Sequence, residues 1–356
     1  MAADAPEITW PGLITTLLKG QDLTAAEAAW AMDEVMSGNA SPVRLAGLLV
    51  ALRAKGETVA ELGGLADSML AHAQPIDLPA DAIDIVGTGG DRAFTVNVST
   101  MAALVIAGAG ARVVKHGNRA ASSKSGSADV LEALGVNLNL SAARLQEVFN
   151  RVGVAFLFAQ AFHPSMRHAA VARRELGVAT VFNFLGPLTN PARPRAAAIG
   201  CADAAMAPLM AGVLAGRGRS ALVFRGQRDG LDEMAATGPI QVWEARAGQV
   251  TASLLDPVAE LGLDPISLDD LRGADAVRNA AVARQVLDGQ AGPIRQTVLL
   301  NAAAGLVAAG EWAGLTPADG PLARRLRAGM DLAAGSIDSG AAARVLDRWV
   351  EASDLS

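Results

Sequence analysis

The chain has 356 residues, a formal net charge of −6 and a single cysteine, Cys201. This length allows a large core, most readily divided into two lobes. The negative charge argues against a nucleic-acid surface, which needs a basic stripe, and one cysteine excludes an intrachain disulfide or a cysteine metal cluster. The acidic N-terminus is unlike a signal peptide, and no apolar run approaches the roughly 20 residues that span a bilayer. We therefore expect a soluble, cytoplasmic protein with no nucleic-acid or membrane partner.

The first part of the chain, residues 12–73, is predicted to be helical. Apolar residues recur at helix spacing, and each segment has a start signal, such as Thr24, and a glycine or loop at its end. The predicted helices cover residues 13–20, 25–38, 42–56 and 59–73. Pro75 and Pro79 then interrupt the pattern. We place a linker there and predict a small helical domain over residues 1–78.

Strand-like and helix-like segments alternate from residue 83 onward. The predicted strands lie within residues 84–87, 111–117, 154–159, 196–202 and 220–226, and the predicted helices within 100–110, 127–135, 142–153 and 205–218. This alternation is typical of a mainly parallel sheet wrapped by helices. The predicted fold class is therefore α/β, with a large α/β domain over residues 79–356 beside the small all-helical domain.

The segment 83–100 contains the most informative motif. An apolar strand ends in Gly87-Thr88-Gly89-Gly90-Asp91, and a helix is expected to begin just after Asn97. Three glycines allow a sharp turn that brings backbone N–H groups against a bulky anion, and a helix N-terminus adds further donors. The motif is neither a Walker loop nor a dinucleotide fingerprint. We interpret it as a phosphate-binding loop, a pattern that also occurs as an ordinary connection in α/β proteins.

A second strand–loop–helix connection, residues 115–135, is equally rich in groups that bind anions. Lys115 and Arg119 supply cations, whereas Asn118 and several serines supply neutral donors. Open α/β folds bind ligands at the carboxyl ends of their strands. Two such loops in succession therefore predict a ligand site at this edge of the sheet.

A third segment, residues 163–192, combines a basic helix with a stiff apolar turn. Pro164 is predicted to begin a helix on which Met166, Ala170 and Arg173 share a face. An arginine in that position either offers a planar fork to a carboxylate or belongs to a solvated basic face. The helix pattern alone favours the solvated face.

A fourth segment contains an acidic pair, Asp232-Glu233, in a loop after a predicted strand. Magnesium usually takes one or two carboxylates and completes its shell with water and substrate phosphates. The pair is therefore a candidate Mg²⁺ ligand set, although most such pairs in loops are simply solvated.

In this order, the four segments resemble the anthranilate phosphoribosyltransferases, whose fold is shared with the pyrimidine nucleoside phosphorylases. The resemblance covers almost the whole chain and rests on GTGGD (87–91), NVST (97–100), KHGNR (115–119), SSKSGSADVLEALG (122–135), RRELG (173–177), FNFLGPLTNP (182–191) and DGLDE (229–233). The nucleoside phosphorylases do not carry the two longest motifs in this form.

The resemblance implies a small helical domain, joined by part of residues 163–192, and a large α/β domain with the substrates between them. It implies transfer of the phosphoribosyl group of 5-phosphoribosyl 1-pyrophosphate to the amine of anthranilate, with release of pyrophosphate, in tryptophan biosynthesis. Two Mg²⁺ ions per active site and a homodimer are also implied.

The residues implied for the site fall into three sets. The phosphoribosyl donor is expected to contact Gly87, Gly90, Asp91, Thr95, Asn97, Val98, Ser99, Thr100, Lys115, His116, Gly117, Asn118, Arg119, Ala120, Ala121, Ser122, Ser123 and Ser127. Anthranilate is expected to contact Gly87, Asn118 and Arg173, with Gly186-Pro187 along its route. Ser99, Asp232 and Glu233 are the implied Mg²⁺ ligands. No acid or base is assigned, because a neutral aromatic amine needs no strong general base and positioning and electrostatics supply most of the rate.

The sequence departs from the family pattern at two places. Arg225-Gly226-Gln227-Arg228 precedes DGLDE where relatives usually show a His-Gly pair and an acidic residue, which leaves the outer shell of the metal site open. Ala120-Ala121 lack a hydroxyl that relatives often show, which removes one phosphate contact.

Two alternative functions remain at this point. A pyrimidine nucleoside phosphorylase-like enzyme would use free phosphate and no Mg²⁺ pair, so Asp232, Glu233 and Arg173 argue against it. A non-catalytic paralogue that binds nucleic acid is disfavoured by the net charge of −6.

Overall fold

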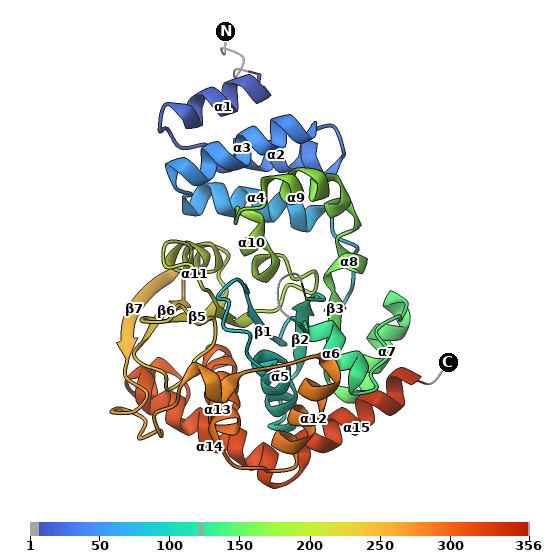
Figure 1. Ribbon diagram of the computed structural model, residues 1–356, viewed down its shortest axis with the longest axis vertical. Coiled ribbons are helices and arrows are strands. Elements are labelled where there is room, and N and C mark those ends of the chain that lie inside the picture. The colour runs from blue at the N-terminus through green and yellow to red at the C-terminus, as the bar shows by residue number, and fades with distance from the viewer. Residues whose placement is uncertain (1–6, 121–123, 355–356) are drawn as a thin grey trace.

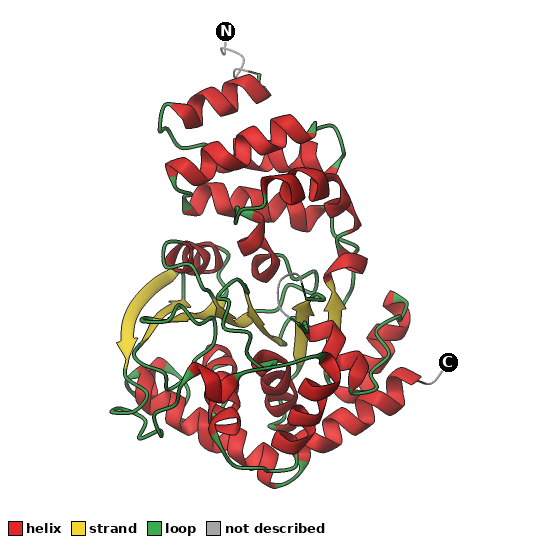
Figure 2. Ribbon diagram, in the orientation of Figure 1, coloured by secondary structure: helices red, strands yellow, loops and turns green. Residues whose placement is uncertain are grey.

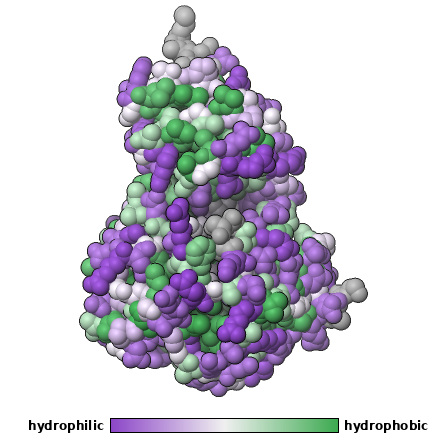
Figure 3. Space-filling model, in the orientation of Figure 1, coloured by the Kyte–Doolittle hydropathy of each residue, from purple (hydrophilic) through white to green (hydrophobic). Residues whose placement is uncertain are grey.

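The computed structural model describes residues 7–120 and 124–354. A smaller lobe projects from a larger one (Figure 3). The smaller lobe is helical, and the larger lobe is built around a sheet (Figure 1). The described strands all lie in the larger lobe (Figure 2). These features confirm the predicted fold class.

Four N-terminal helices form most of the smaller lobe: α1 (Trp10–Leu18), α2 (Ala25–Met36), α3 (Pro42–Lys55) and α4 (Val59–Ala71). Their starts follow from capping chemistry, since the Thr58 side chain accepts the N–H of Glu61 while the Glu61 carboxylate accepts the N–H of Thr58. The first helix begins three residues earlier than predicted. Thr9 caps it and Pro11 occupies its first turn, so the apolar pattern starting at residue 13 missed its true start.

The segment 164–188 packs against these helices although it lies far away in sequence (Figure 1). Its elements are η1 (Pro164–Ala169), α9 (Ala170–Leu176), α10 (Phe182–Leu185) and η2 (Gly186–Leu188). Ala172, Phe182 and Phe184 belong to the same apolar core as the N-terminal helices. The helix predicted from Pro164 is therefore a 3₁₀ turn followed by a short α-helix.

The larger lobe contains a seven-stranded sheet in the order β3-β2-β1-β4-β5-β6-β7. The strands are β1 (Ile83–Gly87), β2 (Val113–Gly117), β3 (Val154–Phe158), β4 (Ala196–Gly200), β5 (Ser220–Gly226), β6 (Ile240–Arg246) and β7 (Gln249–Leu255). Strands β1 to β5 are parallel, whereas β6 and β7 add an antiparallel hairpin at one edge. The five parallel strands were predicted from the sequence and the hairpin was not.

Helices cover both faces of this sheet. The helices of the larger lobe are α5 (Val98–Gly108), α6 (Ser127–Ala133), α7 (Ala142–Val152), α8 (Ala159–Phe162), α11 (Met206–Gly216), α12 (Ala276–Leu287), α13 (Pro293–Ala309), α14 (Leu322–Asp338) and α15 (Ala341–Asp354), with short turns η3 (Leu268–Leu271) and η4 (Pro317–Asp319). Helices α5 and α13 contact one face, and α11 contacts the other. Side chains alternate accordingly: Leu222 and Phe224 join the α5/α13 core, while Val223 joins the α11 core. In the described residues, no helix is long and apolar enough to cross a membrane.

Candidate active site

The loops that follow β1, β4 and β5 meet at the carboxyl edge of the sheet. The backbone N–H of Gly89 donates to Oδ2 of Asp232 at 2.6 Å, and the N–H of Thr88 donates to the carbonyl of Gly200 at 2.9 Å. A Cβ atom at Gly87 or Gly200 would overlap Asp232. Glycine is therefore needed at both positions so that the loop carrying Asp232 can lie against the ends of β1 and β4.

Three carboxylates gather in this region, and two of them are almost completely buried. Asp232 is 7% exposed and Glu233 is 8% exposed. Burial, reinforced by the negative charge of Asp91, raises the pKa of Asp232 to about 8. Burial and then the charge of Asp232 raise the pKa of Glu233 well above its usual range. A cation placed among these carboxylates would stabilise their ionised forms.

The side chains around the acidic pair fit Mg²⁺. A hydrogen bond from the backbone N–H of Ser99 opposes the rise in the pKa of Glu233, and the hydroxyl of the same residue accepts from Nζ of Lys115 at 3.1 Å. Within residues 7–120 and 124–354, no group of three or more His, Cys, Asp or Glu side chains forms a metal cage. Two carboxylates and a hydroxyl suit an ion that takes its remaining ligands from water and substrate phosphates.

Lys115 is the buried cation beside this acidic group. It is 2% exposed, and its Nζ donates to the carbonyl of Ile85 at 2.5 Å and to Oγ of Ser99 at 3.1 Å. Burial lowers its pKa to about 8, against the opposing effect of Asp84, Glu233 and Asp232. The predicted cation of the second loop therefore lies beside the predicted metal ligands.

Asn97 joins the two predicted phosphate loops. Its Nδ2 donates to the carbonyl of Ser125 at 3.2 Å, and its Oδ1 accepts from Nδ2 of Asn279 at 2.9 Å. Thr95 lies in an isolated antiparallel bridge with Arg272. Val98 and Thr100 are buried in the first turn of α5, which starts directly after Asn97.

The second loop bends sharply between β2 and α6. A Cβ atom at Gly117 would lie 2.7 Å from the Phe156 ring, and one at Gly126 would overlap the backbone of Ala120. The backbone N–H of Ala120 donates to Asp129 at 3.1 Å, and Ser127 is the first residue of α6. Three of the residues predicted to contact the phosphoribosyl donor lie outside the described residues: Ala121, Ser122 and Ser123.

Arg119 is engaged with two carboxylates of α6, the helix that follows its loop. It pairs with Asp129 at 3.0 Å and with Glu132 at 2.6 Å, and its guanidinium lies over the Phe158 ring. These bonds raise its pKa above the usual value. Contact of Arg119 with the phosphoribosyl donor stays a prediction.

A cavity of about 460 Å³ lies between the lobes beside the second loop. Asn118 of the second loop lines it together with Met166, Ala170, Arg173, Phe182 and Gly186 of the segment 164–188. The Arg173 guanidinium carbon is 5.2 Å from the centre of the Phe182 ring. Burial lowers the pKa of Arg173, and no carboxylate in the described part of the chain pairs with it. The structure therefore places Arg173 in a cavity rather than on a solvated face.

Two buried histidines form one wall of this cavity. Nδ1 of His116 lies 2.9 Å from the carbonyl of Gly186, and Nε2 of His163 lies 2.9 Å from the carbonyl of Thr189. Their ring centres are 5.2 Å apart. Burial lowers the pKa of His116 to about 3, so its ring is neutral near pH 7. The side chain of His116, predicted to contact the phosphoribosyl donor, lines the Arg173 cavity, and sequence reasoning missed His163.

Asp84 was also missed as a residue of the site. It is 1% exposed and accepts from the backbone N–H of His116 at 3.1 Å and from Nδ2 of Asn190 at 2.8 Å. It thereby joins the strand before the second loop to the turn that contains Gly186. An aspartate inside an apolar strand was the signal that could have revealed it.

The unusual segment before the acidic pair begins with Arg225, whose side chain bonds to the neighbouring strand. Nη1 of Arg225 donates to Oε1 of Gln241 on the neighbouring strand β6 at 3.0 Å. A Cβ atom at Gly226 would overlap the Asp229 carboxylate, so glycine allows the tight turn there. Asp232 and Glu233 remain beside the GTGGD loop despite this departure.

Comparison with known proteins agrees with this arrangement. A model of the glycosyl transferase family helical bundle domain matches residues 11–73, and a model of the glycosyl transferase family a/b domain matches residues 79–343. An anthranilate phosphoribosyltransferase from Arthrobacter sp. (strain FB24) is 60% identical over 349 residues, which cover 98% of this chain and 97% of the relative. The chain belongs to the anthranilate phosphoribosyltransferase family.

Two solved anthranilate phosphoribosyltransferases share this fold. The enzyme from Thermus thermophilus is 43% identical, with a TM-score of 0.86 over 96% of this chain and 98% of that one. The enzyme from Saccharomyces cerevisiae in complex with PRPP and Mg is 28% identical, with a TM-score of 0.85 over 98% of both chains. The family assignment thus covers both lobes and the cleft between them.

Proposed function

We propose that this protein transfers the phosphoribosyl group of 5-phosphoribosyl 1-pyrophosphate to the amine of anthranilate, a step of tryptophan biosynthesis. One observation carries the proposal, namely that two different sites lie beside the second loop. One is a buried acidic cluster, and the other is a cavity with an arginine that pairs with no described carboxylate. The first suits a metal-bound polyanion, and the second suits a small aromatic carboxylate. The bound PRPP and Mg of the Saccharomyces cerevisiae relative support this reading.

The reaction breaks the bond between C1 of the ribose and the pyrophosphate oxygen, which keeps the electron pair. The amine nitrogen of anthranilate forms the new bond to C1 and then loses a proton to solvent. Lys115 would stabilise the growing negative charge, together with the backbone amides of the GTGGD loop other than those of Thr88 and Gly89, which bond to Gly200 and Asp232. The pair Asp232 and Glu233, with Ser99, would hold Mg²⁺, which neutralises the leaving pyrophosphate.

We further propose that two Mg²⁺ ions bind per active site. Three carboxylates, Asp91, Asp232 and Glu233, lie near one another, and among the described residues the buried Lys115 is the cation that opposes their charge. Two divalent ions and a polyanionic substrate would together balance this group. Isothermal titration of Mg²⁺ in the presence of the phosphoribosyl donor measures the stoichiometry.

Anthranilate would bind with its carboxylate on Arg173 and its ring beside Phe182. Asn118, at the start of the second loop, lines the same cavity and would orient the amine toward the phosphoribosyl donor. The neutral His116 and His163 place no competing charge there. Positioning of a neutral amine is then sufficient, and no side chain is assigned as general base.

The domain organisation and assembly are also proposals. The packing of η1, α9 and α10 on α2, α3 and α4 supports a small domain of residues 1–78 joined by part of residues 163–192, with the rest of residues 79–356 as the large domain. Val43 and Val50 share one face of α3 and are 81% and 49% exposed, which supports a homodimer contact through α3. We propose a cytoplasmic location, because a polyanionic donor does not cross a bilayer unaided and must be used where it is made.

One assay tests the function directly. Anthranilate fluorescence should fall when the phosphoribosyl donor and Mg²⁺ are added together, and should stay constant when either is omitted. Release of ribose 1-phosphate from pyrimidine nucleosides and free phosphate would instead support the nucleoside phosphorylase alternative. Constant fluorescence under all conditions would reject the proposed reaction.

A further inference from the structure

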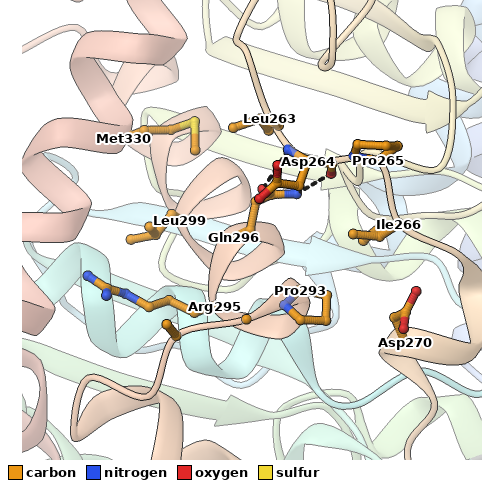
Figure 4. A pocket seen from close by; sticks show the side chains of 12 residues that line it. Leu263, Asp264, Pro265, Ile266, Asp270, Pro293, Arg295, Gln296, Leu299 and Met330 are labelled. Carbon is orange, nitrogen blue, oxygen red and sulfur yellow. Dashed lines mark hydrogen bonds between the residues drawn. The ribbon is translucent and has the colours of Figure 1, made fainter.

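Helix α13 carries two amide side chains that hold separate backbone segments in the same way. Oδ1 of Asn301 accepts the N–H of Met234 at 3.1 Å, and its Nδ2 donates to the carbonyl of Met234 at 2.8 Å. Oε1 of Gln296 accepts the N–H of Asp264 at 3.0 Å, and its Nε2 donates to the carbonyl of Asp264 at 2.8 Å (Figure 4). Each amide therefore pairs with both polar groups of one residue.

The Asn301 contact is fully buried and lies directly beside the acidic pair. Asn301 and Met234 are both 0% exposed, and Met234 follows Glu233 in the chain. Met234 itself belongs to neither a strand nor a helix, so its backbone N–H and carbonyl lack the partners that regular secondary structure provides. Asn301 supplies both hydrogen bonds instead. Nδ2 of Asn301 also donates to the carbonyl of Thr297 at 2.8 Å, which fixes the orientation of the amide.

Helix α13 is a rigid anchor for this contact. It packs against α5, β4 and β5, which carry or border the GTGGD loop and the acidic loop. The apolar side chains next to Asn301, Leu300 and Ala302, are buried in the central core. Through Asn301, α13 thus fixes Met234 relative to the same core that positions Ser99 at the start of α5.

We infer that Asn301 is a positioning residue for the Mg²⁺-binding carboxylates Asp232 and Glu233, an inference that rests on the proposed function. Asn301 contacts neither substrate nor metal; it fixes the backbone one residue beyond Glu233. Glu233 has the Ser99 amide as a partner and is close to the like charges of Asp232 and Asp91, which favour its displacement. Partners in the outer shell of a metal site commonly change metal affinity by about 10- to 100-fold when removed.

Gln296 provides a matched control on the same helix. Its partner Asp264 is exposed and lies at the rim of a separate cavity of about 600 Å³, where Leu299 and Met330 also lie (Figure 4). None of the described residues assigned to the phosphoribosyl donor, anthranilate or Mg²⁺ lines this second cavity. Loss of the Gln296 contact therefore removes a similar pair of hydrogen bonds without freeing the acidic loop.

The test compares Asn301→Leu with Gln296→Leu in the full chain. For Asn301→Leu, we expect the Mg²⁺ concentration for half-maximal activity and the calorimetric Kd of the phosphoribosyl donor with Mg²⁺ to rise about 10-fold or more. The KM for anthranilate should stay within about twofold, and raised Mg²⁺ should restore kcat. Gln296→Leu should leave the Mg²⁺ dependence within about twofold of the parent protein.

The other outcomes distinguish a failure of the Asn301 inference from a failure of the proposed function. If Asn301→Leu does not fold, Asn301→Ser is measured, since a hydroxyl and a water can satisfy Met234 in part; a smaller rise in the same two quantities is expected. An unchanged Mg²⁺ dependence in a folded Asn301 variant, with only a lower Tm, would reject the positioning role. A parent protein without Mg²⁺-dependent transfer would reject the proposed function, whereas calorimetry of donor binding would still test Asn301.

Discussion

The two halves of the cleft contain ionisable groups of opposite kind that lack a matching partner among the described residues. In the donor half, Asp91, Asp232 and Glu233 outnumber the buried cation Lys115. In the acceptor half, Arg173 lies in a cavity whose histidines are neutral, and no carboxylate among the described residues pairs with it. Each half is therefore completed by its ligand, a cation-bound polyanion in one and a carboxylate in the other.

The halves also differ in how they are assembled. The donor half consists of turns that follow strands of one sheet, and glycines such as Gly87 let them approach one another. The acceptor half brings Asn118 of the larger lobe to Arg173, Phe182 and Gly186 of a segment that packs on the helical lobe. A change in lobe orientation should accordingly affect anthranilate binding more than donor binding.

The largest effect is expected from removing the negative charge of the donor half. Asp232→Asn with Glu233→Gln should lower kcat by about 1000-fold, roughly 4 kcal/mol, because Mg²⁺ can no longer be held against the leaving pyrophosphate. Binding of anthranilate, measured by its fluorescence, should persist. Wild-type turnover at ordinary Mg²⁺ concentrations would show that the acidic cluster is not the metal site.

Removing the positive charge of the acceptor half should have a more selective effect. Arg173→Ala should reduce kcat/KM for anthranilate by about 2–4 kcal/mol, because a desolvated, charge-assisted contact with the carboxylate is lost. The KM of the phosphoribosyl donor should change little. Its exposed neighbour Arg174 offers the control Arg174→Ala, which should behave like the parent protein. Equal effects of the two substitutions would contradict the assignment.

The sequence revealed the donor half more completely than the acceptor half. The glycine loop, Lys115 and the acidic pair each stand beside a strand signal, and parallel strands bring such loops to one edge. The pattern around Arg173 also fitted a solvated helix, and only the packing of residues 164–188 on the helical lobe buries it. Nε2 of His163 lies against a backbone carbonyl distant in sequence, so no local motif marks this residue, whereas Asp84 could have been noticed as an aspartate inside an apolar strand. The β6–β7 hairpin likewise lay in a region without a loop motif.

The pH dependence of stability tests the contact that joins the two halves. Burial, opposed by Asn190 and Lys115, raises the pKa of Asp84 from its ordinary value of 3.8 to about 6. The folded state therefore holds the proton more tightly, so this stabilisation is present below pH 3.8 and is lost as the pH rises through 6.

Chemical unfolding of the parent protein and of Asp84→Asn at a series of pH values measures this loss. The free energy of unfolding of the parent relative to the variant should fall by about 3 kcal/mol between roughly pH 4 and pH 8. Asp81→Asn, on the exposed turn before β1, serves as the control. A difference that does not vary with pH would show that Asp84 ionises in the fold as it does in the unfolded chain.

The smallest effect on the chemistry is expected from the surface that belongs to neither half. Val43→Glu with Val50→Glu places charges on the exposed side of α3, where the proposed homodimer contact lies. The double variant should be a folded monomer, because burial of two carboxylates opposes association. The turnover number should change by about twofold or less, since neither residue lines the cleft. Val277→Glu, on α12 of the larger lobe and 76% exposed in the parent, should leave the assembly unchanged. Sedimentation velocity measures the outcome. A dimer that persists with both charges on α3 would show that the contact lies elsewhere. A monomer without activity would show that the two halves of the cleft need the second subunit to function.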